Sequence, residues 1–149
     1  MNTNKIWMRL LMAGTLLVLL FTTACGMEKA INGPAEQALA EQGDALMTCL
    51  KAGDFQAVYE MMSSDAQRDL DMAISSAGSV VDVKSIIKDV GSQIARWNFE
   101  KARIVTINGT SRGTLIGKVV YLNGKSGKVR LEFEEQGGTW KVEGSSFIQ

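Results

Sequence analysis

The chain has 149 residues, with 16 basic and 16 acidic side chains and no histidine. This length suits one domain with one hydrophobic core once a leader segment is set aside. The balanced charge lacks the excess of basic residues that is typical of proteins that bind nucleic acid. The absence of histidine removes the commonest general base and the commonest metal ligand.

Residues 1–24 have the layout of a secretory signal peptide. Basic residues lie near the start, residues 10–21 are almost wholly apolar, and small residues ending at Ala24 precede Cys25, which is the order of regions that a signal peptidase recognises. The apolar run of about 12 residues is shorter than the roughly 20 that span a bilayer as a helix. The alternative is a secreted protein with an uncleaved anchor over residues 6–24.

A small residue followed by cysteine at the end of an apolar run resembles the lipobox of bacterial lipoproteins. In that family the cysteine thiol receives a diacylglyceryl group, the leader is removed, and the new amino terminus is usually acylated. The resemblance implies cleavage after Ala24, lipidation of Cys25 with palmitate among the acyl chains, and a lipid anchor in a membrane of the cell envelope. The domain would then face the periplasm or the exterior. Without lipidation, a disulfide between Cys25 and Cys49 is the alternative, because such a compartment permits one.

The helical half of the chain follows a lipidated tether that we expect over residues 25–33. Apolar side chains recur at helical spacing from Ala35 to Leu50 and stop at Gly53, which predicts a long first helix. Cys49 shares its apolar face, so we expect a buried thiol. A single domain is predicted over residues 34–149.

Three shorter helical segments follow in the sequence. Asp54 is a natural N-cap for the second helix, and Ser64 with Gln67 has the spacing of a capping box for the third. The stretch "SSAGS" at 75–79 predicts a loop. Asp82 can cap the last helix, whose apolar stripe runs to Ile94.

After Trp97 the hydrophobic period changes to two, which is typical of strands. Strands are predicted over residues 99–107, 114–122, 128–135 and 139–144, with glycine-rich turns between them. The 114–122 strand has apolar residues on both faces and is expected to be central, whereas the next places Val129, Leu131 and Phe133 on one face only. Helices followed by an antiparallel meander predict an α+β fold.

This arrangement resembles the nuclear-transport-factor-2-like superfamily, whose members fold as a cone of helices against a strongly curved antiparallel sheet. The likeness covers roughly residues 35–149 and rests on "CLKAGDFQAVYEMMSSDAQ" at 49–67 and "GGTWKVEGSSF" at 137–147. It implies N-terminal helices packed on such a sheet, with a cavity between them. The residues expected to line the cavity are Tyr59, Tyr121, Val129, Leu131, Phe133 and Trp140.

Two classes of function remain open at this point. Enzymes of the resembled superfamily, such as steroid isomerases and dehydratases, place an acid, a tyrosine or a histidine inside the cone, and the candidates here are Tyr59, Tyr121 and Asp82. The favoured hypothesis is a non-catalytic envelope module that binds a protein, a peptide or a small apolar ligand, because no convergent polar groups can be identified. We expect no cofactor and no metal, since no acidic cluster has the spacing of a calcium loop. A third hypothesis is a purely structural partner in an envelope complex, for example as a homodimer formed through the outer face of the sheet.

Overall fold

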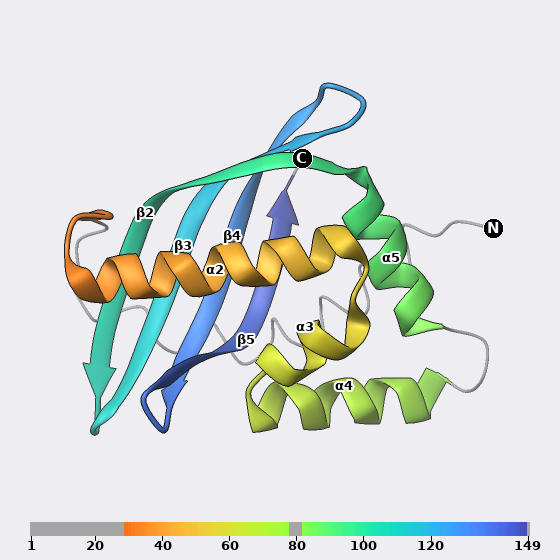
Figure 1. Cartoon of the computed structure of the whole chain (residues 1–149). Helices are drawn as coiled ribbons and strands as arrows, with labels where there is room; N and C mark the ends of the chain where they lie inside the picture. Colours follow the sequence, from red (N-terminus) through yellow and green to blue (C-terminus); the bar gives the residue numbers. More distant parts are fainter. Residues whose placement is uncertain (1–28, 78–81, 149) are drawn as a thin grey trace.

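The computed structural model describes residues 29–77 and 82–148, so the signal-like segment and Cys25 lie outside the described part (Figure 1). The elements are β1 (Lys29–Ala30), α2 (Pro34–Ala52), α3 (Phe55–Met61), α4 (Ser64–Ala77), α5 (Val83–Gln93), β2 (Ile94–Ile107), β3 (Thr110–Tyr121), β4 (Ser126–Gln136) and β5 (Thr139–Ile148). Four helices are therefore followed by four long strands within these ranges. The predicted α+β class is confirmed.

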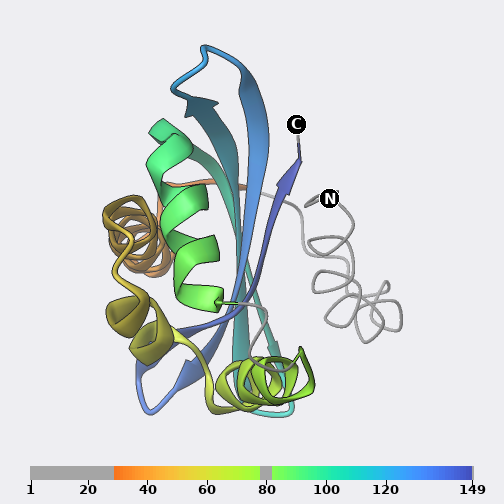
Figure 2. The ribbon, with the colours of Figure 1, turned by 90° about the vertical axis from the view of Figure 1, so that its right-hand side faces the viewer.

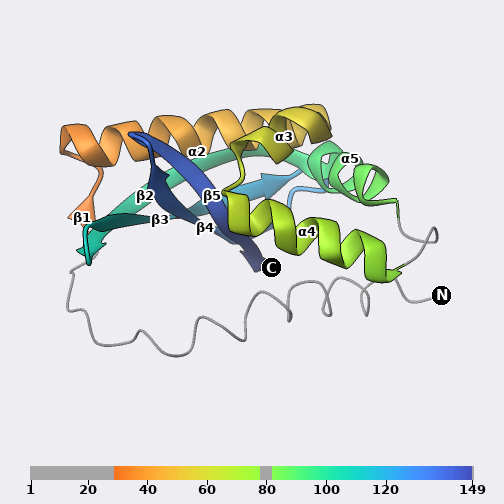
Figure 3. The same ribbon diagram turned by 90° about the horizontal axis from the view of Figure 1, so that it is seen from below.

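The strands form one antiparallel sheet in the order β1-β2-β3-β4-β5 within the described residues, which confirms the central place of β3. Register shifts in β2, between Phe99 and Lys101, and in the β4–β5 pair, between Glu132 and Phe133, mark bulges that bend strands and increase their twist. The helices α2, α3 and α5 lie on one side of the sheet (Figure 2), whereas α4 lies at its end beside β5 (Figure 3). Helices against a curved antiparallel sheet are the arrangement that the resemblance implied.

Three predicted helix ends are confirmed by their capping bonds. Gly53 takes the left-handed conformation with φ 69° at the end of α2, where it donates its N–H to the last carbonyls of the helix. The Asp54 carboxylate accepts from the N–H of Ala57 at 3.1 Å and begins α3. The Asp82 carboxylate accepts from the N–H of Lys84 at 3.1 Å and begins α5.

The predicted capping box of α4 is wrong by one residue. The N-cap is Ser63, whose hydroxyl oxygen accepts from the N–H of Ala66 at 3.1 Å. The Gln67 side chain does not return to the helix start, because its amide donates to the carbonyl oxygen of Tyr59 at 2.7 Å. Two adjacent serines with the same capping chemistry made either register acceptable, and the hydrogen bond from the Ser63 N–H to the Val142 carbonyl oxygen of β5 decided between them.

Three other predicted boundaries differ from those in the structure. The predicted loop at 75–79 begins later, because α4 continues to Ala77 and the hydroxyls of Ser75 and Ser76 donate to carbonyls four residues back. The first long strand begins at Ile94 rather than at residue 99. Lys29 and Ala30, inside the expected tether, pair with Ala102 and Lys101 of β2.

The core lies between α2 and the inner face of the sheet. Leu39, Leu46 and Met47 of α2 are at most 2% exposed and belong to one cluster with the inner residues of β3 and β4. The helix crosses the sheet closely at Gly43, where a Cβ atom would meet the ring of Phe99 at 2.9 Å. The Trp97 indole N–H donates to Asp44 of α2 at 2.7 Å and ties the helix to β2.

Candidate functional site

Three of the six residues predicted to line a cavity lie at the centre of the core. Val129, Leu131 and Phe133 are 0%, 0% and 1% exposed. They point from β4 toward α2 and form one cluster with its apolar side chains. These three residues therefore hold the helix on the sheet, and none of them lines either of the two surface depressions discussed below.

Tyr121 and Trp140 occupy opposite parts of the same inner layer. Tyr121 is buried at the end of β3, beside Ile94, where α5 gives way to β2. Trp140 is half-buried at the start of β5 and packs against the rim of the core. Neither lines a described depression. Tyr121 therefore belongs to the packed core, whereas Tyr59 lines a described depression.

Tyr59 is the one predicted residue of the six that lines a described depression. It lies on α3, and its hydroxyl donates to the Asp71 carboxylate of α4 at 2.9 Å. Its ring stacks on that of Phe55 with centroids 5.9 Å apart. The hydrogen bond to Asp71 raises the pKa of Tyr59 above its ordinary value, with burial and the Asp71 charge as smaller causes.

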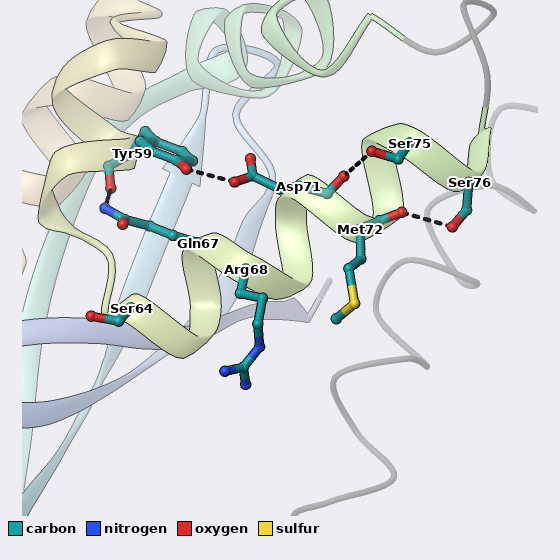
Figure 4. A pocket seen from close by; sticks show the side chains of 8 residues that line it. All are labelled: Tyr59, Ser64, Gln67, Arg68, Asp71, Met72, Ser75 and Ser76. Carbon is teal, nitrogen blue, oxygen red and sulfur yellow. Dashed lines mark hydrogen bonds between the residues drawn. The ribbon is translucent and has the colours of Figure 1, made fainter.

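The depression lies between α3 and α4 and has a volume of about 510 Å³ (Figure 4). It is open to solvent. Its lining consists of Tyr59, Ser64, Gln67, Arg68, Asp71, Met72, Ser75 and Ser76. Several of its polar groups already have partners within the fold: Gln67 binds a carbonyl of α3, and Arg68 forms an ion pair with Asp65 at 3.0 Å.

The Tyr59–Asp71 pair is poorly suited to acid–base catalysis at neutral pH. General acids and bases work best with a pKa near the operating pH, and active sites reach this by burial. Here the pKa of Tyr59 moves away from neutrality because the neighbouring carboxylate opposes loss of its proton. Both side chains lie at the open surface, so the depression offers polar contacts rather than a tuned proton donor.

Asp82, the remaining candidate for the enzyme hypothesis, has a structural role. Its carboxylate accepts from the N–H of Lys84 and from the hydroxyl of Ser85. The bond from Ser85 is the main reason that the pKa of Asp82 falls below its ordinary value. Asp82 therefore stays ionised as the cap of α5. Among the residues that the structure describes, no three histidine, cysteine, aspartate or glutamate side chains gather to hold a metal.

Ser63 and Glu143 form a junction that the sequence patterns did not indicate. Ser63 is fully buried, and its N–H donates to the carbonyl oxygen of Val142 at 2.8 Å, which joins the start of α4 to β5. Partial burial raises the pKa of the neighbouring Glu143, and a hydrogen bond with Ser63 opposes this shift. The bulge in the β4–β5 pair places Glu143 outside the ladder, which simple alternation could not predict.

The cysteine predictions have different outcomes. Cys25 lies outside the described residues. Cys49 is a free thiol and only half-buried, so the expectation of a buried thiol is wrong. Cys49 packs at the border of the core, because α2 points Leu46 and Leu50 more directly at the sheet. In the described ranges, no helix has both the length and the apolar character needed to cross a membrane.

Comparison with known proteins adds one similar structure. No family model matches the sequence, and no curated protein matches it. One solved structure similar to this chain is a designed nuclear-transport-factor-2-like protein carrying five substitutions. The two share 14% sequence identity with a TM-score of 0.48, over 75% of this chain and 98% of the designed one. A likeness at this level indicates no function.

Proposed function

We propose that this protein is an envelope lipoprotein, anchored through Cys25, whose α+β domain is a non-catalytic binding module. The observation that carries the proposal is the packed inner face of the sheet. The side chains that would line a catalytic cone fill the space against α2 instead, and Val129, Leu131 and Phe133 are almost completely buried. Convergent polar groups, which a catalytic site requires, have no room at these positions.

The same packing favours a protein or peptide over a small apolar ligand as the partner. Small-molecule sites typically enclose about 70–90% of their ligand's surface. The α3–α4 depression is open, and its rim carries Met72, which is 53% exposed. An exposed, flexible methionine beside hydrogen-bonding serines and Tyr59 can contact a broad partner surface. The α3–α4 face is therefore the proposed contact region of the module.

Metabolic labelling tests the anchor. The full chain expressed in a bacterium should incorporate labelled palmitate and partition into detergent, because the Cys25 thiol is the proposed acylation site. Cys25→Ala should abolish both properties, whereas the matched change Cys49→Ala should preserve them. Label that persists in Cys25→Ala contradicts the proposal. So does a wild-type chain that takes up no label.

Turnover assays test the non-catalytic part. Ester, phosphate, glycoside and enolisable ketone substrates should show no rate above background with the purified chain. The isomerase or dehydratase alternative gains support if a substrate is turned over and Tyr59→Phe abolishes that rate without loss of folding. Ser75→Ala, at the opposite end of the depression, is the matched control.

A further inference from the structure

The charges of the domain are separated between its helices and its strands. Residues 34–93 contain ten acidic and four basic side chains, whereas residues 94–148 contain five acidic and nine basic ones. The first range forms the helices and the second forms β2 to β5. Three of the ten acidic residues belong to α4, at the end of the sheet (Figure 3). The other seven lie on or cap α2, α3 and α5, which cover one side of the sheet (Figure 2), so this side of the domain is acidic.

The strand register places most of these basic residues on the face of the sheet opposite α2, here called the outer face. Cross-strand pairs join Lys101 to Ile116 and Ile116 to Arg130 in one row, and Lys118 to Lys128 in another. Their strand neighbours Leu115, Val119 and Val129 point into the core, so these rows point away from it. Seven basic residues of β2, β3 and β4 lie on the outer face: Arg96, Lys101, Arg103, Arg112, Lys118, Lys128 and Arg130.

Among the described residues of β2, β3 and β4, basic side chains on the outer face outnumber acidic ones by seven to three. Each of the three acidic residues binds a basic one, at 3.2 Å for Glu100 with Lys118, 3.0 Å for Glu132 with Arg130 and 3.3 Å for Glu134 with Arg112, and Glu143 of β5 adds a further negative charge near Arg112. The side chains of Lys118 and Arg130 remain 67% and 50% exposed. Lys101, Arg103 and Arg130 also surround a small depression of about 40 Å³.

The position of β1 limits where a lipid anchor can enter a bilayer. Lys29 pairs with Ala102, next to Lys101 and Arg103. Lys29 lies four positions after Cys25, and an extended chain spans at most about 3.6 Å per position, or roughly 14 Å in all. An anchor at Cys25 must therefore enter the membrane close to the basic side chains of β2. Such an anchor would tether the edge of the sheet, and not the acidic helical side, to the lipid.

We propose that the outer face of the sheet docks on anionic lipid headgroups. The proposal rests on the lipid anchor of the preceding section, which supplies the short tether. Lysine and arginine side chains within a Debye length of an anionic surface are attracted to its phosphates. The acidic side chains of the helical side are repelled by the same surface. In this orientation the α3–α4 depression, at the end of the sheet, stays accessible to a partner.

Lysine acetylation of the full chain in vesicles tests the orientation with native residues as probes. The measured quantity is the acetylation rate of each lysine, determined by mass spectrometry. In vesicles of phosphatidylcholine with phosphatidylglycerol, Lys118 and Lys128 should react several-fold more slowly than in phosphatidylcholine alone. Lys84 and Lys88, on α5, should react equally in both. At 1 M salt the protection should vanish, because the Debye length falls from about 10 Å at 0.1 M to about 3 Å.

Paired variants test which basic side chains bind the domain to the anionic lipid. Lys101→Gln with Lys128→Gln should lower the ratio of docked to undocked domain about fivefold per lysine removed, read from the acetylation of Lys118. Lys84→Gln with Lys88→Gln removes the same charge from the helical side and should leave Lys118 protected.

The outcomes separate docking from anchoring. Protection of Lys118 that is equal in neutral and anionic vesicles overturns the proposal, and this is also the result that a homodimer over the outer face would give. Equal protection of Lys84 and Lys118 overturns it as well. Protection that depends on anionic lipid in a chain that takes up no palmitate supports docking and contradicts lipidation, since an uncleaved anchor ending at residue 24 provides a similarly short tether.

Discussion

The packing of α5 against α2 depends on Gly91, and Gly91→Ala is the most direct test of this contact. Gly91 is buried at the crossing of the two helices. A Cβ atom added there would lie 2.7 Å from the carbonyl carbon of Leu50, closer still to its oxygen, and 3.2 Å from Cα of Lys51. Cβ atoms essentially never come within 3.0 Å of other heavy atoms. The obstacle is backbone, so α5 must move away from α2.

Two opposing effects set the size of the change. Alanine is favoured over glycine inside a helix by about 1 kcal/mol. Forcing extra volume into a packed contact typically costs about 1–3 kcal/mol, and more where backbone must shift. Because both helices are held by the sheet, we expect the clash to exceed the propensity gain. The net loss should be about 2 kcal/mol in the free energy of unfolding, or roughly 8 °C in Tm for a domain of this size.

Urea unfolding followed by tryptophan fluorescence, with thermal unfolding by circular dichroism, measures both quantities. Gly144→Ala is the matched control, because the nearest heavy atom to its Cβ would be a flexible carboxylate oxygen of Glu132 at 3.7 Å. That variant should stay within about 0.5 kcal/mol of wild type. If Gly91→Ala is as stable as wild type, helix propensity dominates and the close approach of α5 to the Leu50 carbonyl is refuted.

Three further predictions concern the sheet, the α4 junction and the depression. Leu131→Asp should cost several kcal/mol in urea unfolding because it buries an unpaired charge, whereas Glu132→Lys on the outer face should change stability by about 1 kcal/mol or less; equal losses would contradict the register of β4. Glu143→Gln should raise Tm at pH 7, because burial raises the pKa of Glu143 in the fold above its ordinary 4.5 and ionisation of this side chain therefore opposes folding. As the pH falls through that raised pKa, wild type should gain stability relative to this variant. The opposite trend would refute the burial argument. Asp71→Asn should lower the pKa of Tyr59 toward its ordinary value in an NMR titration of ring-labelled tyrosine, and an unchanged pKa would show that the hydrogen bond is absent in solution.

Much of the local structure was determined by the sequence itself. Gly53, Asp54 and Asp82 mark helix ends in the predicted places, because left-handed backbone and N-terminal capping depend on the residue at one position and its immediate neighbours. The alternation in β4 similarly identified the buried face that contains Leu131, since side chains on a strand change sides at every residue. Such signals are local, and the fold left them unchanged.

Contacts between distant segments required the tertiary structure. The choice of Ser63 over Ser64 as N-cap depends on β5, which binds the N–H of Ser63 from a position far along the chain. The extra strand at Lys29–Ala30 forms only because an edge of β2 is available to it. Gly43, which weakens a helix when considered alone, is needed where α2 approaches Phe99.

For the candidate sites, too, the sequence determined the local pattern and the tertiary structure determined the contacts. Apolar periodicity correctly identified the inner residues of β4, but could not show whether they surround a cavity or pack against α2, because both require the same pattern. Tyr59 gains its partner Asp71 only when α3 and α4 come together. The surplus of basic residues after Ile94 is present in the sequence. Only the register of the strands places seven of them on one face, because side-chain direction in a sheet depends on pairing and bulges as well as on residue type.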